Sequence, residues 1–79
     1  MAKKDEDFKF EIKEHIEDLS DANEKGWKIE LNVVSWNGGE DKYDIRSWNS
    51  DHTKMGKGIS LTYDQIALLG SALFDKGIC

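Results

Sequence analysis

The sequence has no proline, a single cysteine and no long apolar run. Because Cys79 stands alone at the C-terminal end, neither an intrachain disulfide nor a thiolate metal cluster can form. No stretch approaches the roughly 20 consecutive apolar residues of a membrane-spanning helix, and no repeat, biased tract or linker divides the chain. These absences predict one soluble domain of a reducing compartment, with no membrane partner.

The small size of the chain makes the missing disulfide important. A domain within 79 residues buries a small core, which is marginal unless a disulfide, a metal or a partner chain adds stability. Since the first two are not indicated, oligomerisation is the expected support. Residues 1–7 are mostly charged and predict a disordered segment, which leaves residues 8–79 as the domain.

Positive charge is scarce and unevenly placed. The net charge is -5, and residues 1–25 hold nine acidic residues against five lysines, whereas residues 26–79 hold seven against six basic residues. The only arginine, Arg46, lies in this second part. Affinity for phosphate comes from concentrated cations, so a nucleic-acid site here would depend on local geometry rather than on bulk charge.

Alternation of apolar and polar residues predicts the strands. Phe8, Phe10 and Ile12 alternate with charged residues, and the phase then shifts, which indicates a bulge near Lys13–His15. A helix is the alternative for residues 12–19, where apolar residues also occur at spacings of four and three. A loop over residues 20–26 follows in either case.

Residues 27–36 and 42–49 predict a β-hairpin. The connection Asn37–Glu40 contains Asn and Gly, which tolerate the positive backbone angles of tight turns. One row of the first strand is apolar and is the expected core: Trp27, Ile29, Leu31 and Val33. If the two strands pair in register, Trp36, Arg46 and Trp48 share the opposite face.

The end of the chain predicts a helix. After a polar loop over residues 50–57 and a short strand at Ile59–Leu61, Thr62 and Gln65 form a capping box that starts a helix at Tyr63. The helix is expected to run to Lys76. Gly70 within it costs about 1 kcal/mol relative to alanine, which indicates either close approach by a second subunit or neutral drift.

The hairpin face suggests a function. Exposed indoles stack on unpaired bases and guanidinium groups pair with phosphate, so this face is a candidate platform for single-stranded nucleic acid. Taken from the residues alone, two other interpretations stay open. Trp36 and Trp48 are a cross-strand pair that only stabilises the hairpin, or the face docks a peptide or another chain.

An enzyme is not expected. His15, His52, Asp44 and Asp51 are the available acid–base or metal groups, and no metal-ligand, Cys-His or phosphate-loop spacing occurs. The two histidines lie far apart on polar segments and are expected to be solvated. We therefore predict no cofactor, no metal and no small-molecule substrate.

The strand order and two motifs resemble a known family. Tyr-Asp-Ile-Arg-Ser-Trp at 43–48 and Lys-Gly-Ile-Ser-Leu-Thr at 57–62 resemble the transcriptional coactivator positive cofactor 4 family, and among its members the small bacterial YdbC-like proteins. The resemblance covers roughly residues 8–74. It implies an α+β fold in which a curved four-stranded antiparallel sheet is followed by one C-terminal helix. It also implies a homodimer, built through the helices, that grips single-stranded DNA.

This resemblance, together with the strand pattern, predicts the contact residues. Those for nucleic acid are Lys28, Val34, Trp36, Asn37, Gly38, Arg46, Trp48 and Lys57, and those for the dimer are Ile66, Leu69, Gly70 and Leu73. Val34 and Asn37 stand where the family has basic residues, which is expected to lower the affinity. The predicted function is non-catalytic, sequence-independent binding of single-stranded DNA in transcription, replication or repair in a bacterial cytoplasm. The sequence does not separate DNA from RNA.

Overall fold

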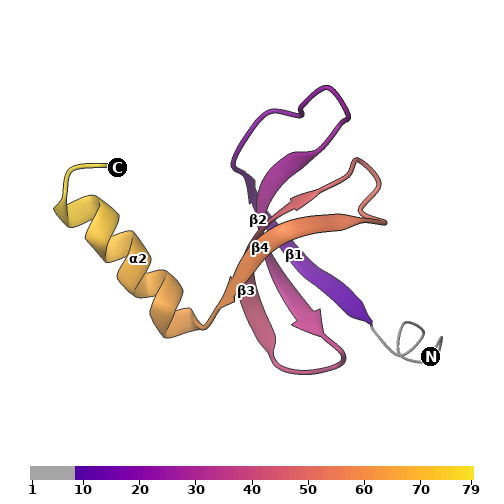
Figure 1. The fold of residues 1–79 in the computed structure, drawn as a ribbon. Helices are drawn as coiled ribbons and strands as arrows, with labels where there is room; N and C mark the ends of the chain where they lie inside the picture. Colours follow the sequence, from indigo (N-terminus) through magenta and orange to yellow (C-terminus); the bar gives the residue numbers. More distant parts are fainter. Residues whose placement is uncertain (1–8) are drawn as a thin grey trace.

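Four strands form one antiparallel sheet in chain order, and a single helix follows them (Figure 1). The structure is a computed structural model that describes residues 9–79. Its elements are β1 (Phe10–Asp18), β2 (Lys28–Trp36), β3 (Asp41–Trp48), β4 (Met55–Leu61) and α2 (Tyr63–Asp75). The predicted α+β class and the order of its elements are confirmed. The disorder predicted for residues 1–7 and the strand position of Phe8 lie outside the described residues.

Residues 10–18 form a strand and not a helix, and the strand is irregular where the phase of the pattern shifts. The pairing with β2 slips between Ile12 and Glu14 and again between His15 and Glu17. Each slip leaves one β1 residue without an opposite residue, which bends and twists the strand. The predicted bulge is confirmed, and a second irregularity follows it.

The hairpin of β2 and β3 pairs in register. Lys28 lies opposite Trp48, Glu30 opposite Arg46, and Ser35 opposite Asp41. Asn37 and Gly38 at the turn have φ angles of 52° and 75°, in the left-handed region that Asn and Gly adopt most readily. The turn residues therefore fix the register that places Trp36, Arg46 and Trp48 on one face.

The prediction of which face forms the core is wrong for the described chain. In the apolar row predicted for residues 27–33, Ile29 is 43% exposed, and Trp27, Leu31 and Val33 are only half-buried. The opposite row is the buried one, with Val34 and Trp48 fully covered together with Glu30, Asn32 and Asp44. The cause is the curvature of the sheet, because side chains from strands that are not neighbours meet across the concave face. Phe10 of β1 contacts Trp48 of β3 at 5.2 Å between ring centroids.

Strand β4 is longer than the sequence pattern indicated. It begins at Met55, so the Gly-Lys-Gly segment at 56–58 belongs to the strand rather than to the preceding loop. Strand β4 can pair closely with β3 over this segment, because the glycines carry no side chain that would clash with β3. A Cβ at Gly58 would lie 2.4 Å from the carbonyl oxygen of Ile45.

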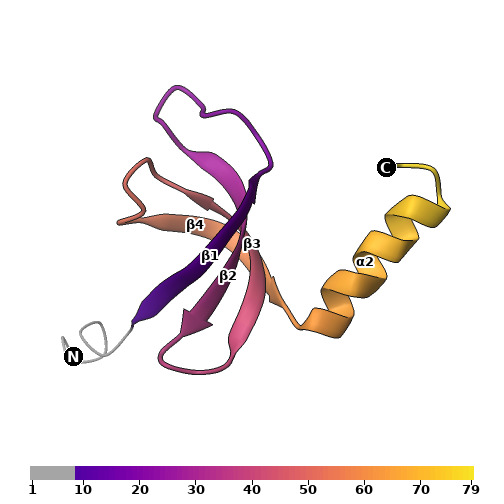
Figure 2. The same ribbon diagram turned by 180° about the vertical axis from the view of Figure 1, so that it is seen from behind.

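Helix α2 starts as predicted and stands away from the sheet. Thr62 Oγ1 accepts from the Gln65 amide at 3.2 Å, and Gln65 Oε1 accepts from the Thr62 amide at 2.9 Å, which completes the capping box. Figures 1 and 2 show α2 projecting from the end of β4, to one side of the sheet. None of its residues is buried. Among the described residues, no helix has the length and apolar character to cross a membrane.

Candidate nucleic-acid interface

The guanidinium group of Arg46 is held in a fixed orientation over an aromatic ring. Its central carbon lies 5.1 Å from the ring centroid of Trp36, within the range of a cation–π interaction. Nε donates to Asp44 Oδ1 at 3.0 Å, and Nη2 donates to Asp44 Oδ2 at 2.9 Å. Nη1 donates to the Gly56 carbonyl at 3.2 Å. These bonds use three of the five N–H groups of the arginine and set its plane.

Two further hydrogen bonds close this arrangement into a ring. Trp36 Nε1 donates to Ser60 Oγ at 2.9 Å, and Ser60 Oγ donates to Asp44 Oδ2 at 2.8 Å. Asp44 is fully buried, and the Arg46 side chain is 15% exposed. A buried, bidentate carboxylate pair of this kind is geometrically specific. The platform that we define by Trp36, Asp44, Arg46 and Ser60 is therefore preorganised.

Sequence reasoning found half of this platform. Trp36 and Arg46 were predicted to contact nucleic acid, and the structure brings them together. Asp44 was named among the acid–base or metal groups, and Ser60 was not singled out. Asp44 lies two positions before Arg46, in the same row of the strand, and Ser60 lies opposite Asp44 on β4. The strand pattern of the sequence shows both positions, but the burial of Asp44 depends on the curvature of the sheet.

Trp48 does not expose its indole, so the prediction that this ring is exposed on the hairpin face is wrong. Its residue exposure is 0%, and Phe10 and His52 cover it with ring centroids at 5.2 Å and 5.5 Å. Val34 is also fully buried. In this conformation both residues support the face from within. Trp48 Nε1 is buried with no hydrogen-bond acceptor among the described residues, which costs about 1–3 kcal/mol.

The remaining predicted contacts surround the platform at different distances along the strands. Lys57 is exposed and lies in β4 between the two glycines that adjoin Arg46. Lys28 lies at the other end of the hairpin and pairs with Asp18 at 3.0 Å. The hydrogen bond to Asp18 raises the pKa of Lys28. Lys57 is thus next in sequence to Gly58, the residue opposite Arg46, whereas the ammonium group of Lys28 is already paired with Asp18.

The hairpin tip has one structural residue and one open residue. Asn37 accepts from the Lys9 amide through Oδ1 at 2.7 Å, and its own amide donates to the Lys9 carbonyl at 2.7 Å. These two bonds attach the start of β1 to the turn. Gly38 is exposed, and a Cβ there would meet no atom within 4 Å, so it is accessible to a ligand.

The prediction that the two histidines lie far apart is wrong. His15 of β1 and His52 of the β3–β4 turn both lie beside the carboxylate of Glu30. Burial raises the pKa of Glu30, but hydrogen bonds from Asn32 and His52 and the nearby histidines outweigh it, so the net shift is downward. Glu30 is thus an ionised carboxylate within the concave face.

The predicted dimer residues line an apolar groove between α2 and the sheet. The groove has a volume of about 350 Å³ and is lined by Leu19, Leu31, Ile45, Ile66, Leu69, Gly70 and Leu73. Its walls therefore include all four residues predicted for the dimer contact. Leu68 and Phe74 on α2 are 70% and 73% exposed. The helix and the sheet thus leave apolar surface that residues 9–79 do not cover by themselves.

Comparison with known proteins gives two matches. Residues 23–72 match the family model described as Transcriptional Coactivator p15 (PC4). A protein of Treponema pallidum (strain Nichols), described as an uncharacterized protein, is 44% identical over 68 residues, which cover 86% of this chain and 79% of that protein. The matched family segment contains every residue of the Arg46 platform.

Proposed function

The chain belongs to the transcriptional coactivator p15 (PC4) family, and from that premise we propose that it binds single-stranded DNA through its Arg46 platform. Family membership indicates nucleic-acid binding connected with transcription. The observation that supports the finer proposal is the guanidinium of Arg46 fixed over Trp36 by a buried carboxylate. A preorganised, planar cation beside an indole is suited to both parts of a nucleotide, the base and the phosphate.

In this mechanism an unpaired base extends the stack of Trp36 and Arg46. Every base has a flat face, so such stacking is independent of sequence and contributes roughly 1–3 kcal/mol per base. Lys57 then contacts a neighbouring phosphate, while the glycine on either side of it lets the strand come close. Duplex DNA binds less well, because its bases are already stacked on each other.

We propose that the working unit is a homodimer. Each chain carries both the apolar groove and exposed apolar side chains on α2. In a two-fold dimer, α2 of one copy therefore covers the groove of the other copy, and the reverse. A small domain with no disulfide gains the burial that it lacks. The occupant of the groove is then the helix of a second copy, with Ile66, Leu69, Gly70 and Leu73 at the contact.

We further propose that the protein acts without catalysis in the bacterial cytoplasm, in transcription, replication or repair. A role as a peptide-docking module is the alternative for the same face. Salt separates the two, because DNA binding weakens steeply between low and moderate salt, whereas docking of a largely apolar peptide does not. RNA of the same length, compared at one fixed salt concentration, measures the preference between the nucleic acids.

Quenching of tryptophan fluorescence by an oligothymidine tests the platform. Arg46→Lys keeps a positive charge beside the buried Asp44 but loses the planar fork, so the fold is expected to persist while affinity falls by roughly 1–3 kcal/mol, the value of one stacked base. Trp27→Phe, on the other face of the sheet, is the matched control and should bind as the wild type does. Unchanged affinity in a Trp36→Ala, Arg46→Lys double variant would reject the proposed face.

A further inference from the structure

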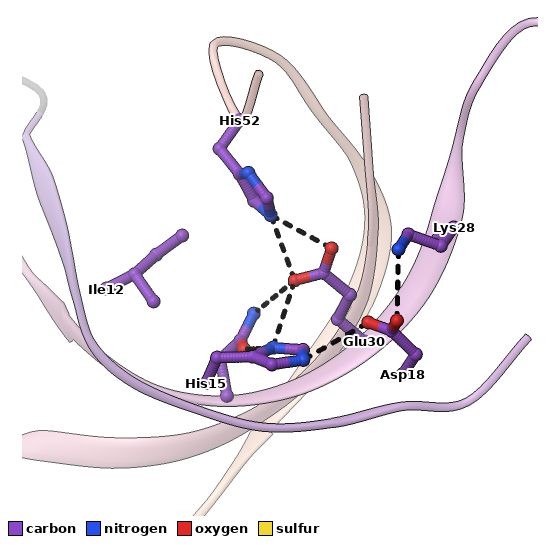
Figure 3. A pocket seen from close by; sticks show the side chains of 7 residues that line it. Ile12, His15, Asp18, Lys28, Glu30 and His52 are labelled. Atoms are coloured by element: carbon purple, nitrogen blue, oxygen red, sulfur yellow. Dashed lines mark hydrogen bonds and ion pairs between the residues drawn. The ribbon is translucent and has the colours of Figure 1, made fainter. Parts of the chain in front are cut away.

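A second cluster of polar side chains lies on the concave face, beyond the Arg46 platform. Its residues come from β1, β2 and the β3–β4 turn and surround the carboxylate of Glu30 (Figure 3). They line a pocket of about 430 Å³: Ile12, His15, Asp18, Lys28, Glu30, Asn32 and His52. Glu30 is only 4% exposed at its side chain, while the two histidines are accessible from the pocket.

The distances from the histidine nitrogens to the Glu30 oxygens are similar to those between two ligand atoms of one metal ion. His52 Nε2 lies 2.9 Å from Glu30 Oε2 and 3.0 Å from Oε1, and His15 Nδ1 lies 3.5 Å from Oε1. Two ligands about 2.0–2.1 Å from a tetrahedral zinc ion lie about 3.3 Å apart. The ligand atoms of His15, Asp18 and Glu30 also fall within 4.8 Å of one another, whereas His52 is not part of that group. The imidazoles of His15 and His52 must therefore rotate toward each other beside Glu30 to bind the same ion.

We propose that this cluster binds a divalent transition-metal ion of the zinc type, with His15, Glu30 and His52 as ligands. Two imidazoles and one carboxylate are a donor set that favours Zn²⁺ and related ions over Mg²⁺ or Ca²⁺. An ionised carboxylate with little exposure supplies the negative charge, and the open side of the pocket leaves the fourth position for water.

The neighbours of the cluster are arranged to orient the ligands. His15 Nε2 lies 3.1 Å from Asp18 Oδ1, and Lys28 Nζ holds Asp18 at 3.0 Å through Oδ2. A histidine that binds metal through one nitrogen commonly donates to a carboxylate through the other. Asp18 is thus a positioning residue rather than a ligand. Asn32 donates to Glu30 Oε1 at 3.0 Å, and its Oδ1 lies 2.7 Å from His15 Nδ1. The ion would replace this second contact, while the first fixes the carboxylate.

Two backbone features bring the histidines to this position. His15 stands between the two pairing irregularities of β1, and His52 has a φ of 60° in the turn between β3 and β4. The ion would then join three segments that are separate in sequence. It would tie the edge strand β1 to the turn, and binding would raise the thermal stability of the chain.

Isothermal titration of the untagged protein with zinc chloride tests the proposal, without any nucleic acid present. All proteins carry Cys79→Ser, so that the exposed thiol does not bind the ion. We expect one ion per chain and a visible absorption spectrum of tetrahedral type when Co²⁺ replaces Zn²⁺. Protons should be released on binding, because histidine ligands must be deprotonated.

The variants assign the ligands. His15→Gln and His52→Gln keep an amide donor toward Glu30, so the fold is preserved, but each should abolish the Co²⁺ spectrum and saturable zinc binding. Asp18→Asn should weaken binding about 10- to 100-fold, as is usual for the carboxylate behind a ligand. Glu17→Gln, an exposed residue of the same strand, is the control and should leave binding unchanged. The absence of saturable binding to the parent protein, or the parent's affinity retained in either histidine variant, would overturn the proposal. DNA affinity is measured separately, so either proposal can fail alone.

Discussion

Replacing Gly70 by alanine distinguishes a lone helix from one that is packed against a second copy. Within one chain, a Cβ at Gly70 would meet no atom of the described residues within 4 Å. The only effect in an isolated chain is then the gain in helix propensity, about 1 kcal/mol of added stability. For a domain of this size that gain corresponds to a rise in melting temperature of roughly 4–8 °C.

The homodimer proposal predicts the opposite sign. If a helix of the second copy packs against Gly70, the new methyl group overfills a close contact, which typically costs 1–3 kcal/mol. The net change in the free energy of unfolding for Gly70→Ala is then destabilising or near zero. The variant dimer should also dissociate into monomers at a higher protein concentration than the wild-type dimer does. Melting curves at several protein concentrations, together with the mass from light scattering, measure both effects.

Ala67→Gly is the matched control for this experiment. Ala67 is exposed on the same helix and does not line the groove, so glycine there should cost about 1 kcal/mol whatever the oligomeric state. A melting temperature of Gly70→Ala that rises by the full propensity gain, with no dependence on concentration, would refute close packing at this position. A monomeric mass for the wild type would refute the dimer itself.

Two other predictions concern the sheet. Gly58→Ala should destabilise the fold by about 1–3 kcal/mol or more. The added Cβ would lie 2.4 Å from the Ile45 carbonyl oxygen and 2.5 Å from Arg46 Cβ. A denaturant midpoint equal to that of the wild type would contradict this prediction. Burial raises the pKa of Glu30, but its hydrogen bonds and the histidines lower it overall from 4.5, so the unfolded chain binds more protons below that value. The contribution of the ionised carboxylate is therefore present above about pH 4.5 and is lost as the pH falls through the folded-state pKa. The difference in melting temperature between wild type and Glu30→Gln should shrink over that range, and a constant difference would contradict the assignment.

Local features of the fold could be predicted from the sequence. The turn at Asn37 and Gly38, the register of the hairpin and the capping box at Thr62 each depend on residues close together in the chain. Backbone preference and side-chain period indicate them without knowledge of contacts between distant residues. The same reasoning located Arg46 and Trp36 on one face.

Burial could not be predicted in the same way. Alternation separates the two faces of a strand but does not say which face the sheet folds over. Trp48 is buried because β1 carries Phe10 across the concave side, a contact between strands that are not neighbours. His15 and His52 meet at Glu30 for the same reason, although 36 positions separate them in the chain. Residues that are distant in the sequence can be close in space, and for this reason the predicted separation of the two histidines was wrong.

The indole N–H of Trp48, buried without an acceptor among the described residues, marks where this sheet is expected to open most easily. Packing Phe10 against the Trp48 ring gains ring contact, but burial of the indole N–H forfeits a hydrogen bond with solvent. The closed arrangement is therefore less stable than its packing alone suggests. Strand β1 lies at the sheet edge and has two breaks in its pairing. Its amides should consequently exchange with deuterium sooner than those of β2 and β3. Transient release of this one strand would wet the floor of the concave face while the hairpin stays intact.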